Sequence, residues 1–110
     1  MKSRLEAEFD EAMLDIYRHA KSDAGYTATR FLGMVVSRGG LDTAQYLIHA
    51  DTISDGYAAL CERNRLDLTV EYLILEPKWK PLFTKAERHV AVRRLREYGY
   101  AGQLPDVDSE

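Results

Sequence analysis

Four short apolar segments follow one another between Gly25 and Leu75, with only brief polar breaks between them. They span residues 26–36, 41–48, 56–61 and 68–75. A helix of two or three turns is marginal by itself in water, so segments this short gain stability only by packing against one another. The pattern predicts an all-α fold, a compact bundle of about six short helices.

The composition indicates a single globular domain. A chain of 110 residues is long enough for one core, which buries roughly two-thirds of the surface of the unfolded chain. A hydrophobic fraction of 45% and a charged fraction of 30% are typical of globular rather than disordered proteins. We expect a helical domain over residues 1–100. Residues 101–110 contain a proline, three acids and few apolar groups, which predicts a flexible acidic tail.

The sequence favours a cytoplasmic protein with no part embedded in a membrane. No apolar run approaches the roughly 20 residues needed to span a bilayer. The N-terminal residues turn acidic at once and lack the apolar region of a signal peptide. The single cysteine, Cys61, cannot form an intrachain disulfide, and its neighbours Ala59 and Leu60 predict a buried thiol.

The first helix is predicted to begin at Ser3, because Ser3 and Glu6 have the spacing of a capping box. Apolar residues then recur at helical spacing as far as Ala20. Leu14 falls outside this apolar stripe. A single exposed leucine is ordinary in a globular protein, and the alternative is that Leu14 contacts a partner subunit.

The second helix is predicted from about Thr27 to Arg38, ending at a pair of glycines, Gly39 and Gly40. Apolar side chains cover most of its circumference, so we expect it to be the central and most buried element. These side chains are Phe31, Leu32, Met34, Val35 and Val36. Gly33 costs this helix about 1 kcal/mol relative to alanine, unless a neighbouring helix crosses closely there.

The segment 68–75 is the most ambiguous one. Its apolar residues alternate with polar ones as in a strand, and it is rich in residues that favour strands. Asp67 can cap a helix at its start, and no other segment offers itself as a partner strand. We therefore favour a helix and keep the strand as the alternative.

A last helix is predicted from Thr84 to Tyr98, since Thr84 and Glu87 form a second capping-box pattern. Four of its cationic or titratable residues share one side, namely Lys85, His89, Arg93 and Arg96. A basic stripe of this kind can follow a phosphate backbone, with Arg63 and Arg65 as additional contacts. The alternative is a solvated outer face, because cations also suit the C-terminal end of a helix.

Arg94 differs from the other arginines of this helix because its spacing places it among the apolar positions. A buried guanidinium needs an acidic partner. We expect Arg94 to pair with an acid from another element, either Glu71 or Asp67.

The stretch from Leu41 to Arg65 also resembles a helix-turn-helix, a motif that binds DNA. Its turn at Asp51 and Thr52 lacks the glycine that this motif usually contains, and the second helix would present acidic residues to anionic DNA. Two helices packed in a bundle account for the same pattern.

No catalytic motif stands out in the sequence. The three histidines, His19, His49 and His89, lie on separate elements without a carboxylate or cysteine at ligand spacing, so we expect no metal or cofactor. Cys61 lacks the exposure and the positioned histidine of a catalytic thiol. The alternative is an active site formed by acids that are far apart in the sequence and converge in the fold. These acids are Asp51, Asp55, Asp67 and Glu71.

Several segments, taken in order, resemble a small family of uncharacterised bacterial proteins. They are Ala28-Thr-Arg-Phe-Leu, Gly39-Gly-Leu-Asp-Thr-Ala, Ser54-Asp-Gly-Tyr, Arg65-Leu-Asp-Leu-Thr-Val-Glu, Pro81-Leu-Phe-Thr and Arg94-Leu-Arg-Glu-Tyr-Gly-Tyr. The resemblance covers about Ile16 to Tyr100 and implies a helical module that also occurs as a domain of larger chains. Cys61 and Asn64 stand where the family tends to have tryptophan and glycine. No activity is known for this family, so the resemblance implies no catalytic residue.

Two functional hypotheses follow. The first is a non-enzymatic helical interaction module that binds a protein partner or a second copy of itself. Seven tyrosines favour it, since tyrosine is enriched at binding surfaces. An acidic N-terminal helix and a basic C-terminal helix also favour association. The second hypothesis is a nucleic-acid-binding accessory or regulatory protein that uses the basic C-terminal helix, and an enzyme ranks third.

Overall fold

The computed structural model describes residues 2–110. These residues form six α-helices and three short 3-10 helices, with no strand among them, which confirms the predicted all-α fold. The α-helices are α1 (Arg4–Ala24), α2 (Thr29–Arg38), α3 (Gly40–His49), α4 (Asp55–Glu62), α5 (Val70–Leu73) and α6 (Lys85–Glu97). The 3-10 helices are η1 (Leu66–Leu68), η2 (Pro77–Leu82) and η3 (Val107–Ser109).

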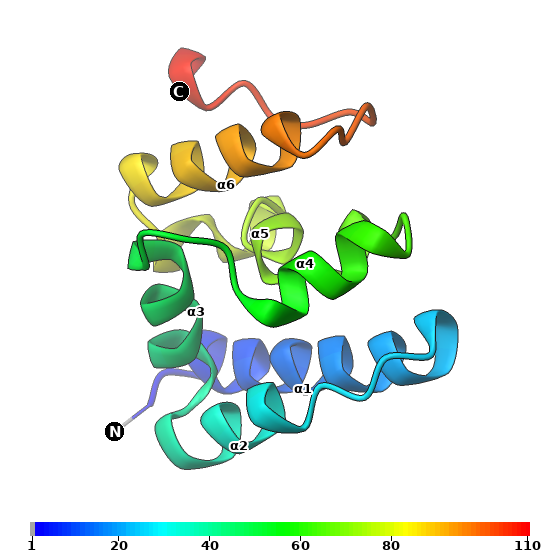
Figure 1. Cartoon of the computed structure of the whole chain (residues 1–110). Coiled ribbons are helices and arrows are strands. Elements are labelled where there is room, and N and C mark those ends of the chain that lie inside the picture. The colour runs from blue at the N-terminus through cyan, green and yellow to red at the C-terminus, as the bar shows by residue number, and fades with distance from the viewer. Residues whose placement is uncertain (1) are drawn as a thin grey trace.

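The helices are arranged in layers (Figure 1). α1 and α2 run in opposite directions along one side, α6 lies along the opposite side, and α4 and α5 lie between them. α3 runs across the layers and packs against both α1 and α6. Within the described chain, every helix is too short or too polar to cross a membrane.

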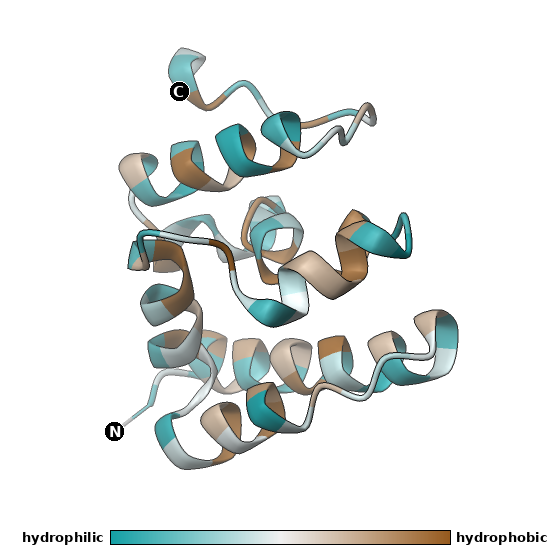
Figure 2. Cartoon of the chain, in the orientation of Figure 1, coloured by the Kyte–Doolittle hydropathy of each residue, from teal (hydrophilic) through white to brown (hydrophobic). Residues whose placement is uncertain are grey.

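The core forms around α1, which packs against α2 and α3 and also against α5, η1 and η2. Phe9 and Met13 of α1 are completely buried. Trp79 and Phe83 meet the ring of Phe9 edge-on, with ring centroids 5.1 and 5.4 Å away. Edge-on aromatic pairs of this kind add to the free energy gained by burial. Hydrophilic and hydrophobic residues alternate around α1 and α6, as expected for helices with one face toward a core (Figure 2).

The expectation that the second helix is the central and most buried element is wrong. In α2 only Val35 is buried, and Val36 is 74% exposed. The physical reason is position, because α2 packs mainly against α1 and α3 and lies at the edge of the bundle. Gly33 is also exposed, and no neighbouring element lies within 4 Å of a Cβ placed on it. A close helix crossing therefore does not explain Gly33.

The close approach occurs instead at the glycine pair between α2 and α3. Gly39 has a φ of 88°, and it ends α2 with its N–H bonded to the carbonyl of Val35 at 2.9 Å. Gly40 is the first residue of α3, and its N–H donates to Oδ1 of Asp10 at 2.7 Å. A Cβ on Gly40 would lie 3.0 Å from Cα of Asp10 and 3.1 Å from Cγ of Met13. Only glycine allows α3 to approach α1 this closely.

The helical interpretation of segment 68–75 is confirmed, since η1 and α5 follow each other there. Leu66, Val70 and Ile74 are buried, and their spacing of four residues suits helical turns rather than a strand. The predicted cap is wrong. Thr69 caps α5, because its Oγ1 accepts a hydrogen bond from the N–H of Tyr72 at 3.2 Å.

The segment 101–110, expected to be a flexible acidic tail, folds back along α6 in the structure (Figure 1). Val107 is only 3% exposed and belongs to the core. The apolar surface of Val107 and the pairing of neighbouring acids with α6 explain this position. The packed domain therefore extends beyond residue 100.

The predicted pairing of Arg94 is confirmed, with Glu71 as the partner. Nη1 of Arg94 lies 3.1 Å from Oε2 of Glu71, and both side chains are almost completely buried. The guanidinium also donates to the carbonyls of Leu47, Ile48 and Ala50 at 3.0, 3.3 and 2.6 Å. Carbonyls at the end of a helix lack intrahelical partners. Arg94 therefore joins α6 to α5 and to the C-terminal end of α3.

Replacing Arg94 should strongly destabilise the fold. We expect Arg94→Met to lower the free energy of unfolding by about 3–5 kcal/mol, because it leaves Glu71 buried without a counter-charge. Urea denaturation followed by circular dichroism measures this change. Arg93→Met is the matched control, since the side chain of Arg93 is 57% exposed, and it should change stability by less than about 0.5 kcal/mol. Equal effects of the two substitutions would contradict the role of Arg94.

The two glycines should respond oppositely to alanine. Gly40→Ala should destabilise the fold by about 1–3 kcal/mol, because its methyl group has to push α3 away from α1. Gly33→Ala should stabilise the fold by about 0.5–1 kcal/mol, since alanine favours a helix and nothing opposes the added methyl group. Thermal unfolding of both variants tests the pair. A destabilising Gly33→Ala would show that α2 has a close neighbour after all.

Candidate functional site

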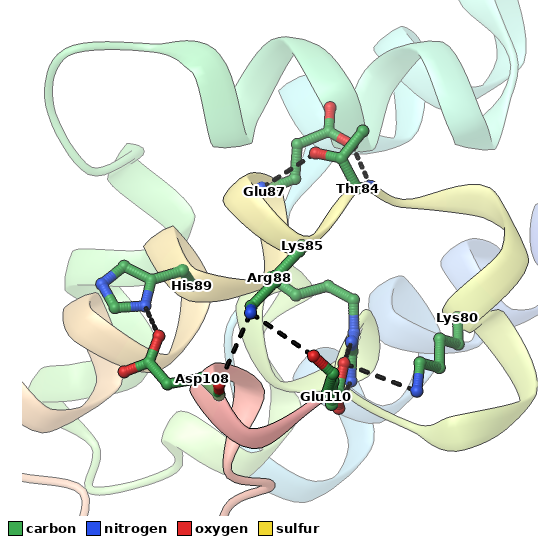
Figure 3. A network of polar contacts seen from close by, with 8 residues as sticks. All are labelled: Lys80, Thr84, Lys85, Glu87, Arg88, His89, Asp108 and Glu110. Carbon is green, nitrogen blue, oxygen red and sulfur yellow. Dashed lines mark hydrogen bonds and ion pairs between the residues drawn. The ribbon is translucent and has the colours of Figure 1, made fainter.

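The four residues of the predicted basic stripe lie on α6, but most of them contact the segment that follows it. Nζ of Lys85 donates to the carbonyls of Asp108 and Glu110 at 3.4 and 3.5 Å. His89 Nδ1 lies 3.3 Å from Oδ1 of Asp108 (Figure 3). Residues 100–110 therefore cover part of the predicted stripe.

The other two residues of the stripe differ in their partners. Arg96 Nη1 donates to the carbonyls of Tyr100 and Gly102 at 2.7 and 2.8 Å. Arg93 lies 3.7 Å from Glu97 on the same helix and borders a cavity of 460 Å³. Arg93 is thus the member of the stripe that pairs within α6 rather than with residues 100–110.

Arg63 and Arg65 lie near the end of α4 and are engaged elsewhere. Arg63 donates to the carbonyl of Ala24 at 3.1 Å, and its guanidinium lies 5.1 Å from the ring centroid of Tyr26. Arg65 forms two hydrogen bonds with Asp67, at 3.0 and 3.2 Å. No described contact joins this pair to the four residues on α6, so the structure does not assemble all six into one surface.

Leu14 is half-buried and packs against the core. α1 has neighbours on more than one side, so a residue outside its main apolar stripe still meets other elements. Covering the core is a sufficient role for Leu14. Its contact with a partner subunit remains a prediction.

Arg88 is a functional candidate that sequence reasoning missed. Its side chain is 3% exposed and meets the carboxylate of Glu110 with both terminal nitrogens, and Nη2 lies 2.8 Å from Oε2. Its Nε is buried without a hydrogen-bond partner. The sequence does carry a signal for Arg88, the same one that identified Arg94. Its helical spacing places it on the apolar side of the helix, with Ala91 and Leu95.

Cationic side chains from two elements contact the carboxylate of Glu110. Besides Arg88 of α6, Nζ of Lys80 in η2 lies 3.5 Å from its carboxylate (Figure 3). Hydrogen bonds from Arg88 are the main cause that lowers the pKa of Glu110 from 4.5 to about 2. The carboxylate is therefore ionised over the whole physiological pH range.

The N-terminal end of α6 holds a second carboxylate. Thr84 and Glu87 form the predicted capping box, with bonds of 2.8 and 3.1 Å (Figure 3). His49 Nε2 of α3 lies 2.7 Å from Oε2 of Glu87. Burial acts to raise the pKa of Glu87, but the bond from the Thr84 N–H and the contact with His49 outweigh it and lower the pKa. Glu87 thus fixes the start of α6 and links it to α3.

Another candidate site is a cleft of 440 Å³ between α2, α3 and α4, with η1 and α5 at its base. Its apolar lining includes Phe31, Met34, Tyr46, Leu47, Ile53 and Leu60. The residues that line the cleft come from separate elements, so no local sequence motif could predict it. The volume lies within the range of roughly 300–1,000 Å³ that is typical of ligand pockets.

Three polar side chains among the residues that line the cleft are buried, namely Tyr57, Thr69 and Glu71. Tyr57 is 2% exposed, and its hydroxyl has no hydrogen-bond partner. Burial is the main cause that raises the pKa of this hydroxyl, so it stays protonated and available as a donor. Burial also raises the pKa of Glu71, and Arg94 partly offsets this effect.

The residues considered for a catalytic site make separate contacts. Cys61 is half-buried rather than buried, and its thiol lies 3.8 Å from the carbonyl of Tyr98. Within residues 2–110, no three histidine, cysteine or acidic side chains gather where they could hold a metal ion. Asp55 and Asp67 pair with arginines near the surface, whereas Glu71 pairs with Arg94 in the interior.

The chain matches no protein-family model, no curated protein and no solved structure. The resemblance to a bacterial family therefore stays a prediction.

The contact between Arg88 and Glu110 should make the position of residues 106–110 sensitive to acid. Because the pKa of Glu110 is lowered in the folded state, its stabilising contribution is present above the unfolded pKa of 4.5 and is lost as the pH falls toward about 2. We expect the methyl NMR signals of Val107 to move toward their unstructured positions over this range, before those of Leu95 change. Glu110→Gln should already show the weakened state at neutral pH. Parallel behaviour of Val107 and Leu95 at every pH would contradict this mechanism.

Proposed function

We propose that this protein is a non-enzymatic helical interaction module that binds an apolar segment of a protein partner in the cleft between α2, α3 and α4. The observation that carries the proposal is the exposed apolar lining of this cleft. Phe31, Met34 and Ile53 are only half-buried, and Tyr46 is 53% exposed. Covering these side chains removes apolar surface from water, which favours association.

The edge of the cleft has the composition of a binding surface. The guanidinium of Arg38 lies 4.6 Å from the ring centroid of Tyr46. Tyrosine and arginine are enriched among the residues that contribute most to protein–protein binding. A stacked arginine is also partly held in place before a partner arrives, which reduces the entropy lost on binding.

Charged pairs border this apolar surface. Arg38 lies 2.8 Å from Asp42, and Arg30 lies 3.4 Å from Asp55. Both side chains of the second pair are almost fully exposed. Exposed pairs of this kind contribute little to stability, so their charges are free to turn toward a partner. An apolar centre with a polar rim is the usual organisation of a protein interface.

The nucleic-acid hypothesis has weaker support. Lys85, His89 and Arg96 already contact residues 100–110. A phosphate backbone would have to displace these contacts, whereas the cleft needs no rearrangement to receive an apolar side chain. The cytoplasmic location expected from the sequence remains part of the proposal.

The partner can be sought with a photoreactive amino acid placed in the cleft. We expect p-benzoylphenylalanine at position 46 to cross-link the partner, or a second copy of the chain. The same group at position 36 should not, because Val36 lies outside the cleft on α2. The purified partner then allows the affinity to be measured by calorimetry.

A matched pair of substitutions tests the site. Met34→Asp should weaken binding about 10–100-fold, which corresponds to the roughly 1.5–3 kcal/mol gained by burying a methionine. Val36→Asp should leave the affinity within about twofold, as the side chain is 74% exposed and outside the cleft. Circular dichroism confirms that both variants are folded. Equal affinities of the two variants would show that the partner does not bind in the cleft.

A further inference from the structure

We propose that the surface of α6 covered by residues 106–110 is a docking site for an acidic segment of a protein partner, and that residues 106–110 are its intramolecular competitor. This inference is independent of the cleft. Arg88, Lys80 and His89 meet the carboxylates of Asp108 and Glu110, and Lys85 donates to the main-chain carbonyls of the same two residues (Figure 3).

Arg88 makes this surface a specific carboxylate site rather than a diffuse basic patch. Its guanidinium is buried, and its two terminal nitrogens meet the two oxygens of Glu110. This two-bond geometry is the one in which arginine recognises a carboxylate selectively. Lys80 of η2 adds a second cation, so the site is formed by side chains outside the covering segment.

The remaining contacts define a pattern. Val107 is buried against the domain and supplies an apolar anchor. Asp108 follows it directly and lies 3.3 Å from His89, and Glu110 lies three residues after Val107 on Arg88 and Lys80. The site therefore fits an apolar residue followed by acids one and three positions later.

Most of the core lies outside the covering segment, residues 106–110, which contributes the side chain of Val107 to it. η3 packs mainly on α6, whereas the main core is built by α1, α3, α5, α6 and η2. The connection between α6 and η3 contains Gly99, with a φ of 93°, and Gly102. Residues 106–110 can thus leave α6 without removing a layer of the bundle.

If residues 106–110 leave α6, the guanidinium of Arg88 needs another anionic partner. Arg88 would then lose the counter-charge and both hydrogen bonds that Glu110 supplies, and its Nε has no partner to offset this loss. An acidic segment from a partner removes this cost by taking the place of Glu110. A tethered competitor acts at a local concentration on the order of millimolar, so only a segment with matching contacts displaces it.

The experiment uses the full chain and a fluorescent peptide with the sequence of residues 103–110. Asp108→Asn/Glu110→Gln removes two charges from the tethered segment without changing its size. We expect the peptide to bind this variant at least about tenfold more tightly than the unaltered chain, because the competitor is weakened. Fluorescence anisotropy at low salt measures the affinity, and circular dichroism checks the fold.

Two controls assign the site. Adding Arg88→Met to the double variant should abolish binding, and a peptide with the same two acids replaced by amides should not bind. If Arg88→Met impairs folding, then Lys80→Met replaces it, since Lys80 is exposed, and should weaken binding several-fold. Arg4→Met, on helix α1 and with a side chain that is 94% exposed, should have no effect.

Three results would overturn the proposal. The first is equal affinity of the peptide for the unaltered chain and for the double variant. The second is the absence of binding to a folded double variant, which would mean that the segment is simply part of the domain. The third is tighter binding of a DNA duplex than of the peptide, which would assign the surface to phosphate instead of carboxylate.

Discussion

The guanidinium of Arg94 donates to three carbonyls at the end of α3 and to Glu71 of α5, so the position of these elements depends on one side chain of α6. Removing such a group from water is expensive unless its hydrogen bonds are satisfied. Here four acceptors meet it, and they come from elements far apart in the chain. The interaction therefore specifies the arrangement of helices as well as stabilising it. Short helices with little stability of their own need such a constraint.

The ion pair between Arg94 and Glu71 connects the two candidate surfaces, which are the cleft and the carboxylate site on α6. Glu71 is among the residues that line the cleft, and Arg94 belongs to the helix that carries the carboxylate site. The surfaces differ in character, because the cleft is mainly apolar while the α6 site consists of Arg88 and exposed cations. Ionic strength screens exposed charges but has little effect on apolar burial. Salt therefore distinguishes what each surface binds.

Local signals made much of the fold predictable, and non-local packing explains the rest. Helix capping acts within four residues, and an arginine among apolar positions requires an acid. The end helices therefore followed from the sequence, and the partner of Arg94 was limited to Glu71 or Asp67. The position of α2 at the edge of the bundle could not be predicted in this way, because the burial of a helix depends on how many other elements pack against it. The cleft also went unseen, since its lining comes from several elements. Arg88 carried the same signal as Arg94, but its partner lies in residues 101–110, for which the sequence predicted no packing.

The glycine pair at the end of α2 has a consequence for how the cleft adapts to what it binds. α2 ends at Arg38 and α3 begins at Gly40, and Gly40 is held against α1. These two helices thus form a rigid corner, which sets one wall of the cleft. The opposite wall begins after α3, where residues 50–54 connect to α4 without helical structure. Any widening of the cleft then comes from residues 50–54. This connection lets the wall formed by α4 adjust to a bound partner, while the wall formed by α2 and α3 stays in place.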